Sequence, residues 1–402
     1  MKNRFLILGS CACCLLAIFA FANSKEATKD PLALSPVVAK RVTTPNGTLI
    51  SCNLKALKDT VDIPLSYLTE DLQIVKLDNR DEALVGGWIR TTVSDNYILV
   101  SNNKQTPYKL FSRDGKFIAN IGAYGQGPNE YGNTYAEQLD EKNNRIYILP
   151  WQSNKLLVFD LKGNPQPPIK LCLRVPKGKF RVDTAKEEVT VTTLPFQGWP
   201  AVVWTQDFQG KRKNFVAPGH LSVPQDFSNE VSMSNNTSAY DVMLMVIMPS
   251  PRTDSLYHYN AAKNRLEARF TVEYPSSDKM PWHGYTEYPR HFTGDVSFPI
   301  QVSENSWSGS KPANYIVDKK TLHGSYYHLY NDFLGTKNMN IWPSFGNGYY
   351  VANMEPVQLK ETLEKELARK DMPSAVRKRA QELVKTLDEE GNNVVLFAKM
   401  KQ

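Results

Sequence analysis

Six residues between positions 282 and 291 bring together aromatic rings, imidazoles, a carboxylate and a guanidinium. They are Trp282, His283, Tyr285, Glu287, Arg290 and His291. Aromatic faces stack on polar ligands such as sugars and peptides, and charged groups fix the orientation of the ligand. We therefore predict that these residues bind a glycan, a peptide or an envelope protein. They lie in residues 274–295, which we expect to form a long loop; the alternative is that the rings only pack on neighbouring strands.

The same segment offers a second chemistry, metal binding. His283, Glu287 and His291 present nitrogen and oxygen atoms, and zinc accepts both as ligands. Their spacing of four residues would align them on one face of a helix, but Gly284 and Pro289 disfavour a helix here. Outside the apolar run of residues 5–21, the chain contains no Cys-x-x-Cys or Cys/His zinc pattern. We therefore predict no resident cofactor, with a divalent metal as the alternative.

The sequence shows no complete catalytic set. Residues 306–310, "SWSGS", do not form a Gly-x-Ser-x-Gly elbow. A Ser/His/Asp triad stays open, because its members need not be close in sequence. Whether the chain is an enzyme is therefore left open, and a binding function is favoured.

A glycine-rich stretch, "IGAYGQGPNEYG" (residues 121–132), raises the question of phosphate binding. A phosphate loop requires a helix N-terminus after the glycines, and here Pro and Gly stand where that helix would begin. No Lys-Ser/Thr pair follows the glycines either. We interpret the stretch as a crossover between two β-structural units, where glycine permits a positive φ.

The elements that must position these residues recur along the chain. In residues 95–116 and 144–164, two β-rich runs flank a polar turn, and Phe111 and Phe159 are 48 residues apart. Looser copies follow, and the six corresponding positions are Phe111, Phe159, Trp204, Tyr259, Val317 and Phe397. Units of 40–50 residues that are mostly strand are typical of β-propellers. We predict an all-β, six-bladed propeller.

One stretch departs from the β pattern. Residues 356–390 are rich in Leu, Glu, Lys and Arg, and Leu359, Leu363 and Leu367 recur every four residues, as on one face of a helix. Pro373 interrupts this pattern. We expect a helical hairpin inserted in the last blade.

The two ends of the propeller are predicted to share a sheet. The last unit lacks an outer strand, whereas the strand-like run "EDLQIVKLDN" (residues 70–79) stands alone before the first unit. We predict that this run completes the last blade and closes the ring, which leaves few exposed strand edges. The propeller would then span residues 61–402, after an N-terminal extension over residues 23–60.

Residues 1–22 are predicted to be a secretory signal peptide. Lys2 and Arg4 precede a long apolar run that ends in the small-x-small site Ala-Phe-Ala at residues 20–22. A retained membrane anchor is an alternative, because the apolar run is marginally long enough to span a bilayer. A lipid anchor at Cys11 is a further alternative, since residues 8–11, "LGSC", resemble a lipobox. We favour cleavage, which leaves no stable membrane span.

Composition excludes some classes of function. Charged residues make up 22% of the chain and the net charge is +7, but the charges are interspersed with no long basic run. Nucleic-acid binding is therefore not expected. After signal cleavage only Cys52 and Cys172 remain. They could pair in an oxidising compartment or stay as two buried thiols.

The repeats resemble a known group. "FSRDGKFIANIGAYGQGPNEYG" (residues 111–132), followed by residues 144–164, resembles the NHL-type repeat and, more closely, the secreted six-bladed β-propeller proteins of Gram-negative anaerobes. Residues 61–87 resemble the opening of the first blade in that group, and the late helical insertion resembles theirs. The resemblance implies a propeller in the periplasm or at the cell surface, and it implies no particular activity.

We therefore predict a secreted, monomeric propeller that acts as a binding or scaffold protein for a glycan, peptide or protein partner. Related six-bladed folds include metal-dependent lactonases and lyases, so a metal-dependent lyase or hydrolase with its site in the central channel is the alternative. Polar groups expected to face that channel are Asp295, Asn353 and Glu355.

Overall fold

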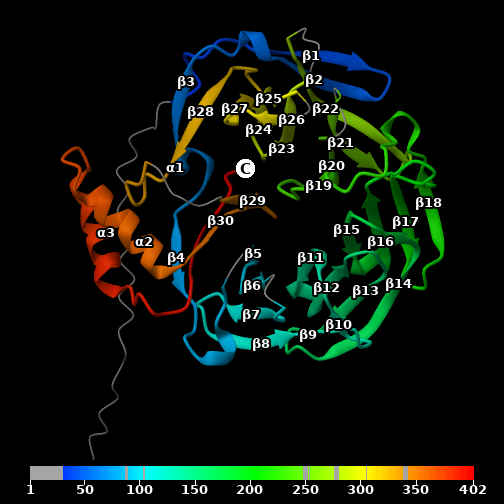
Figure 1. The fold of residues 1–402 in the computed structure, drawn as a ribbon, viewed down its shortest axis with the longest axis horizontal. Helices are drawn as coiled ribbons and strands as arrows, with labels where there is room; N and C mark the ends of the chain where they lie inside the picture. Colours follow the sequence, from blue (N-terminus) through cyan, green and yellow to red (C-terminus); the bar gives the residue numbers. More distant parts are fainter. Residues whose placement is uncertain are drawn as a thin grey trace, which may run out of the picture.

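The computed structural model describes residues 30–86, 89–102, 105–247, 252, 254–275, 280–304, 306–337 and 343–402. The predicted signal peptide, with Cys11, lies outside the described residues. Six sheets are arranged around a common axis and form the predicted six-bladed β-propeller (Figure 1).

The first three blades each consist of four consecutive antiparallel strands. Blade 1 contains β5 (Ile89–Val93), β6 (Tyr97–Asn102), β7 (Tyr108–Ser112) and β8 (Phe117–Ile121). Blade 2 contains β11 (Thr134–Asp140), β12 (Arg145–Pro150), β13 (Ser153–Phe159) and β14 (Pro165–Val175). Blade 3 contains β15 (Gly178–Asp183), β16 (Glu188–Thr193), β17 (Val203–Asp207) and β18 (Arg212–Val216).

Blades 4 and 5 gain strands from the N-terminal part of the chain. Blade 4 contains β19 (Glu230–Ser232), β20 (Asp241–Met245), β21 (Ser255–Asn260) and β22 (Arg265–Glu273). It is extended by β2 (Gly47–Asn53), which pairs with β22, and then by β1 (Ala39–Thr44). Blade 5 contains β23 (Trp282–Glu287), β24 (His291–Ser297), β27 (Ala313–Asp318), β28 (Gly324–Tyr330) and the added β3 (Thr60–Pro64). A two-stranded hairpin, β25 (Pro299–Ser303) and β26 (Ser306–Gly309), lies in sequence between β24 and β27.

Blade 6 joins the two ends of the propeller. It contains β29 (Ser344–Gly346), β30 (Tyr349–Met354), β31 (Val394–Lys399) and β4 (Gln73–Lys76). Strand β4 pairs antiparallel with β31, so that Phe397 lies opposite Gln73 and Val394 opposite Lys76. The predicted closure by residues 70–79 is confirmed, and the outer edge of the last blade is thereby paired.

The six positions that defined the sequence repeat share one structural place. Phe111, Phe159, Trp204, Tyr259, Val317 and Phe397 all lie on the third strand of their blades, and all six are buried. A large apolar side chain at this place fills the space between two adjacent sheets, which explains why the repeat is visible in the sequence. The likeness of these repeats to the NHL type stays a prediction.

The glycine-rich stretch is the predicted crossover. It connects outer strand β8 of blade 1 to inner strand β11 of blade 2, through a short parallel pair of β9 (Ala123–Tyr124) with β10 (Glu130–Tyr131). Gly122 has a φ of +71°, and a Cβ there would lie 2.5 Å from the Tyr131 ring. A side chain therefore has neither the conformation nor the space at this position.

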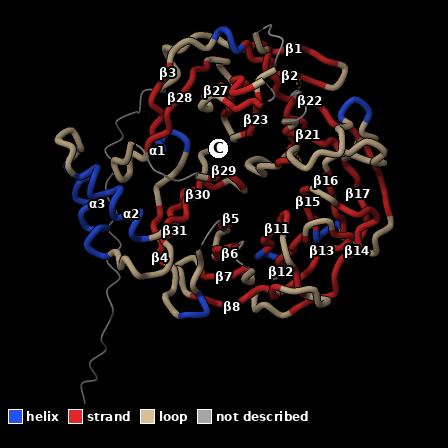
Figure 2. Tube along the Cα trace, viewed as in Figure 1, coloured by secondary structure: helices blue, strands red, loops and turns tan. Residues whose placement is uncertain are grey.

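Helices are few and lie mainly at one edge of the ring (Figure 2). A single turn, α1 (Leu65–Leu68), follows β3. In sequence, α2 (Pro356–Leu367) and α3 (Ser374–Thr386) lie between β30 and β31. Leu359 and Leu363 of α2 are buried against blade 6. The hairpin therefore covers the outside of that blade (Figure 1). Among the residues that the structure describes, no helix has the length and apolar character needed to cross a bilayer.

The two cysteines of the described chain are free thiols. Cys52 is buried on β2, beside blade 4, and Cys172 lies on β14, in blade 2. The disulfide that the sequence left open is therefore not formed. Burial raises the pKa of Cys52 to about 12, so this thiol stays protonated at neutral pH.

Candidate functional site

The segment expected to be a long loop is mostly a β-hairpin, so the loop prediction was wrong. Residues 282–287 form β23 and residues 291–297 form β24, the two inner strands of blade 5. His283, Tyr285 and Glu287 are all buried, at alternate positions, which is the period of a strand with one face in the core. Pro289 lies in the turn, where its missing N–H costs no ladder hydrogen bond.

The first half of this hairpin serves packing. The His283 ring lies 4.9 Å from the Tyr274 ring and 5.2 Å from the Tyr285 ring, measured between centroids, and burial lowers its pKa. The hydroxyls of Tyr274 and Tyr285 are 2.8 Å apart. Trp282 is half-buried, and its indole N–H donates to the carbonyl oxygen of Ile247 over 3.2 Å.

Glu287 belongs to a buried cluster of charges. Its Oε2 lies 2.5 Å from Nε2 of His258, and its Oε1 accepts a hydrogen bond from Nζ of Lys319 over 2.5 Å. Burial raises the pKa of this carboxyl, but its hydrogen bonds with His258 and Lys319 and the positive charge beside it outweigh burial, so the pKa lies below its usual value. Glu287 is therefore an ionised group held by its neighbours.

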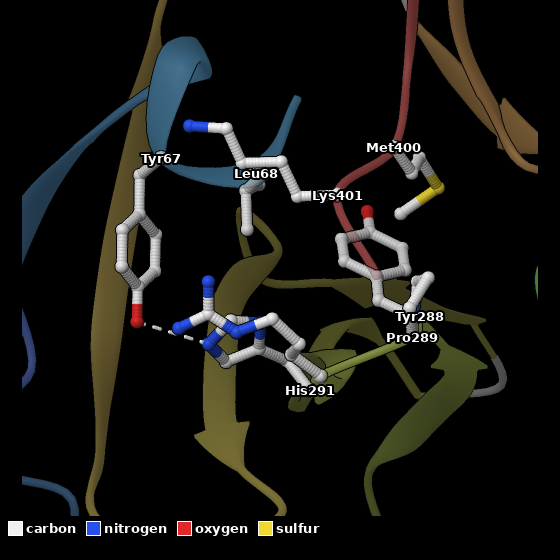
Figure 3. A pocket seen from close by; sticks show the side chains of 8 residues that line it. Tyr67, Leu68, Tyr288, Pro289, His291, Met400 and Lys401 are labelled. Carbon is white, nitrogen blue, oxygen red and sulfur yellow. Dashed lines mark hydrogen bonds between the residues drawn. The ribbon is translucent and has the colours of Figure 1, made fainter. Parts of the chain in front are cut away.

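His291 and Arg290 instead contact Tyr67, a residue of α1. Nε2 of His291 is 3.1 Å from the hydroxyl of Tyr67 (Figure 3). The Arg290 guanidinium lies over the Tyr67 ring at 5.5 Å. The hollow between them has a volume of about 10 Å³, roughly enough for one water molecule. Burial lowers the pKa of His291 to about 4. This hollow is too small for a glycan or a peptide.

The six predicted residues are thus divided among three sets of contacts. His283, Glu287 and His291 each contact different partners, so they do not converge as a metal site would require. Among the described residues, no group of three or more His, Cys, Asp and Glu side chains is placed to hold a metal ion.

A larger cavity, of about 340 Å³, is lined by the inner strands of the propeller. Its lining comes from β5, β11, β15, the residues at the end of β19, and β29 with β30, so five of the six blades contribute. These elements surround the middle of the ring (Figure 1). The cavity is therefore the central site of the propeller, where loops and strand ends of many blades meet.

Two charged groups of this cavity pair across a gap between blades. Arg90, on β5, donates through Nη2 to Oε2 of Glu137, on β11, over 3.0 Å. The same Nη2 is 3.0 Å from the Tyr108 hydroxyl and 3.2 Å from Oγ1 of Thr134. The charge of Glu137 raises the pKa of Arg90 above its usual value. Both charges are therefore compensated within the protein.

Lys179, on β15, is the third charged group of the cavity lining. Its Nζ lies 5.3 Å from the centre of the Tyr135 ring, and within the described part of the chain it has no hydrogen bond or ion pair. Burial lowers the pKa of the amine most strongly, the charge of Glu137 raises it, and the charge of Arg90 lowers it; the net pKa is below the usual value.

Amide side chains complete the polar lining. Asn353 donates to Oγ1 of Thr91 over 2.9 Å and accepts from Asn393 over 2.8 Å. Asn235 accepts from Arg181 over 2.5 Å through Oδ1, and its Nδ2 has no partner among the described residues. Donors that are free in this way are available to a ligand.

Of the three groups expected to face the channel, the structure places only Asn353 in the cavity lining. Glu355 is exposed at the start of α2, and Asp295 lies on β24 outside the lining. The three charged residues of the lining, Arg90, Glu137 and Lys179, were not predicted from the sequence, because each lies in a different repeat. Arg90 and Glu137 are 47 residues apart, close to the repeat length, and charged residues on successive inner strands were the available signal.

One solved structure among the proteins that this chain resembles agrees with the fold. The chain resembles a solved structure described as an exported protein from Bacteroides fragilis NCTC 9343, with 16% identity, a TM-score of 0.57, and coverage of 88% of this chain and 100% of that chain. It also resembles a member of the DUF4221 family from Bacteroides vulgatus, with 11% identity, a TM-score of 0.45, and coverage of 83% and 97%. No curated protein matches the sequence.

The family comparison covers most of the chain. The model described as "Domain of unknown function (DUF4934)" matches residues 49–399, which include strands from all six blades. The chain therefore belongs to the DUF4934 family.

Proposed function

We propose that this protein is a binding protein that holds a polar ligand, a glycan or a peptide segment, in the central cavity of the propeller. One observation carries the proposal: five blades together line a cavity of about 340 Å³ with charged groups and amides. Small-molecule sites have volumes of roughly 300–1,000 Å³ and combine apolar walls with a few polar groups. The rings of Tyr135, Phe180 and Phe345 supply such walls.

Binding is favoured over catalysis by the composition of the lining. General acid–base catalysis requires a group that can give and take a proton, often in a pair. The described lining residues include no histidine or cysteine; their one carboxylate, Glu137, is held by Arg90 as an acceptor, and within the described chain the amine of Lys179 has no acid or base hydrogen-bonded to it. Fixed donors and acceptors of this kind orient a ligand.

The site of action that we propose is the periplasm or the cell surface, with the protein as a monomer. The apolar segment at residues 1–22 has the pattern of a secretory signal, and the B. fragilis neighbour is described as exported. Export supports a role in the cell envelope, where glycans and peptides are available as ligands.

The experiment that tests this proposal fills the cavity with a large side chain and measures the effect on ligand binding. Gly346 lines it, and a Cβ at this position would meet only the carbonyl oxygen of Ser234, at 3.6 Å, so Gly346→Tyr can fold and place its ring in the cavity. Gly132→Tyr is the matched control, because a Cβ there meets nothing within 4 Å and the position lies outside the lining. Binding of glycan fragments and peptides is measured by calorimetry.

We expect Gly346→Tyr to abolish binding and Gly132→Tyr to preserve it. Binding that survives Gly346→Tyr unchanged would place the ligand elsewhere and overturn the proposal.

A further inference from the structure

We propose that the ligand of the central cavity is a small hydroxylated carboxylic acid such as a uronic acid, and that its carboxylate pairs with Lys179. This inference rests on the binding function proposed above and names the chemical class of its ligand.

The charges of the described lining do not balance. Arg90 and Lys179 contribute two positive charges and Glu137 contributes one negative charge, so the net charge of these groups is positive by one. Glu137 accepts from Arg90 at 3.0 Å and is already paired. Lys179 is half-buried, so its unpaired charge loses part of its hydration, and a counterion would offset that loss. The missing negative charge is therefore expected from the ligand.

The surroundings of Lys179 keep its amine available. Its Nζ lies over the Tyr135 ring at 5.3 Å, a contact that attracts the cation and uses none of its N–H donors. The ring is itself fixed, because the Tyr135 hydroxyl donates to Glu230. Burial lowers the pKa of the amine by destabilising its charged form. A ligand carboxylate within hydrogen-bonding distance would stabilise the charged form and raise this pKa again.

A single carboxylate fits better than a phosphate. A phosphate carries nearly two negative charges at neutral pH and is matched by the forked donors of a free arginine. Nη2 of Arg90 already donates hydrogen bonds to Glu137, Tyr108 and Thr134. Lys179 acts as a point charge, and one amine with one excess charge matches one carboxylate.

The neutral polar groups of the cavity suit hydroxyls. Amides and hydroxyls come from Thr91, Ser234, Asn235, Ser344, Asn347 and Asn353. Each of these side chains can both donate and accept a hydrogen bond, as a sugar hydroxyl does. The free Nδ2 of Asn235 is a donor for such a group. The half-buried ring of Phe345 offers an apolar face on which a sugar ring can lie.

The experiment compares acids with their esters on the full mature chain. Glucuronate, galacturonate and N-acetylneuraminate are titrated by calorimetry beside their methyl esters, which keep the hydroxyls and lose the charge. We expect at least one acid to bind and its ester to bind about 10- to 100-fold more weakly, the usual worth of a charge-assisted hydrogen bond.

Variants assign the effect to Lys179. Lys179→Met should weaken binding of the acid by the same factor and leave binding of the ester unchanged, while Lys179→Arg should keep most of the affinity for the acid. Lys162→Met removes an exposed charge from a turn outside the cavity and should change neither. Thermal melts check that each variant is folded.

Three results would overturn the inference: no acid binds, the esters bind as well as the acids, or Lys179→Met leaves binding of the acid unchanged. If instead a neutral glycan or a dipeptide blocked at both ends, N-acetyl-Ala-Ala amide, binds, and Gly346→Tyr blocks it, the inference fails and the proposed function stands. If an acid binds equally well to Gly346→Tyr, both fail.

Discussion

The Arg90 guanidinium of blade 1 and the Glu137 carboxylate of blade 2 are joined by a 3.0 Å ion pair across the boundary between the two blades. Glu137 is the one carboxylate in the described lining of the cavity, and this ion pair already neutralises its charge. Lys179, on the next blade, is therefore the charged group of this cavity that is left for a ligand.

The amine of Lys179 should respond to the charge of Glu137. Because that negative charge raises the pKa of Lys179, we predict that Glu137→Gln lowers this pKa further. Reductive ¹³C-methylation followed by NMR titration measures the shift. Glu361→Gln, which removes an exposed carboxylate from α2, is the control and should leave the resonance unchanged. A pKa of Lys179 that rises in Glu137→Gln would contradict the account.

The charge cluster of Glu287 should be structural. Glu287→Gln removes the buried carboxylate that pairs with Lys319 and shares a hydrogen bond with His258, and we expect a loss of about 3 kcal/mol in the free energy of unfolding. Denaturant titration measures it. Glu273→Gln breaks an exposed pair with Lys40 and should cost far less. Equal losses in the two variants would show that burial of the cluster adds nothing.

The burial of His291 should make stability depend on pH. Its pKa is lowered from 6.5 to about 4 in the folded chain, so between these values the unfolded chain binds more protons than the folded one. Stability is then complete above about pH 6.5 and falls as the pH drops toward 4, by about 3 kcal/mol in total.

Denaturant titrations across this range check the prediction. The His291→Gln variant should lack this component, while the exposed His220→Gln should retain it. A pH dependence that is the same in His291→Gln and in the native chain would refute the assignment.

The closure of the ring can be tested near the C-terminus. Phe397 is fully buried and stacks under Arg113, whose guanidinium lies 4.3 Å from the ring centre. Phe397→Ala should therefore cost about 3–5 kcal/mol, although terminal residues usually tolerate change. Lys399→Ala, exposed on the same strand, should change little. Small losses in both variants would mean that β31 does not complete a closed blade.

The fold was predictable because its signal is local and repeated. A large buried residue on the third strand of every blade marks the period, and the isolated strand at residues 70–79 indicates how the ring closes. These features depend on short-range patterns and on the general cost of an open sheet edge.

The candidate site was not predictable in the same way. Arg90, Glu137 and Lys179 lie on three separate inner strands, and only the closed ring brings them to one cavity. His283 and Glu287 misled the sequence argument, because clustered polar and aromatic residues suggest a binding loop. In the folded chain their alternation instead buries them along a strand.

The most direct test is a crystal structure of the mature protein grown with the acid that binds best in the calorimetric panel. The account predicts electron density for the ligand in the central cavity, with its carboxylate within hydrogen-bonding distance of Lys179. Density for the ligand at another place on the propeller, or an occupied cavity in which the carboxylate points away from Lys179, would contradict it.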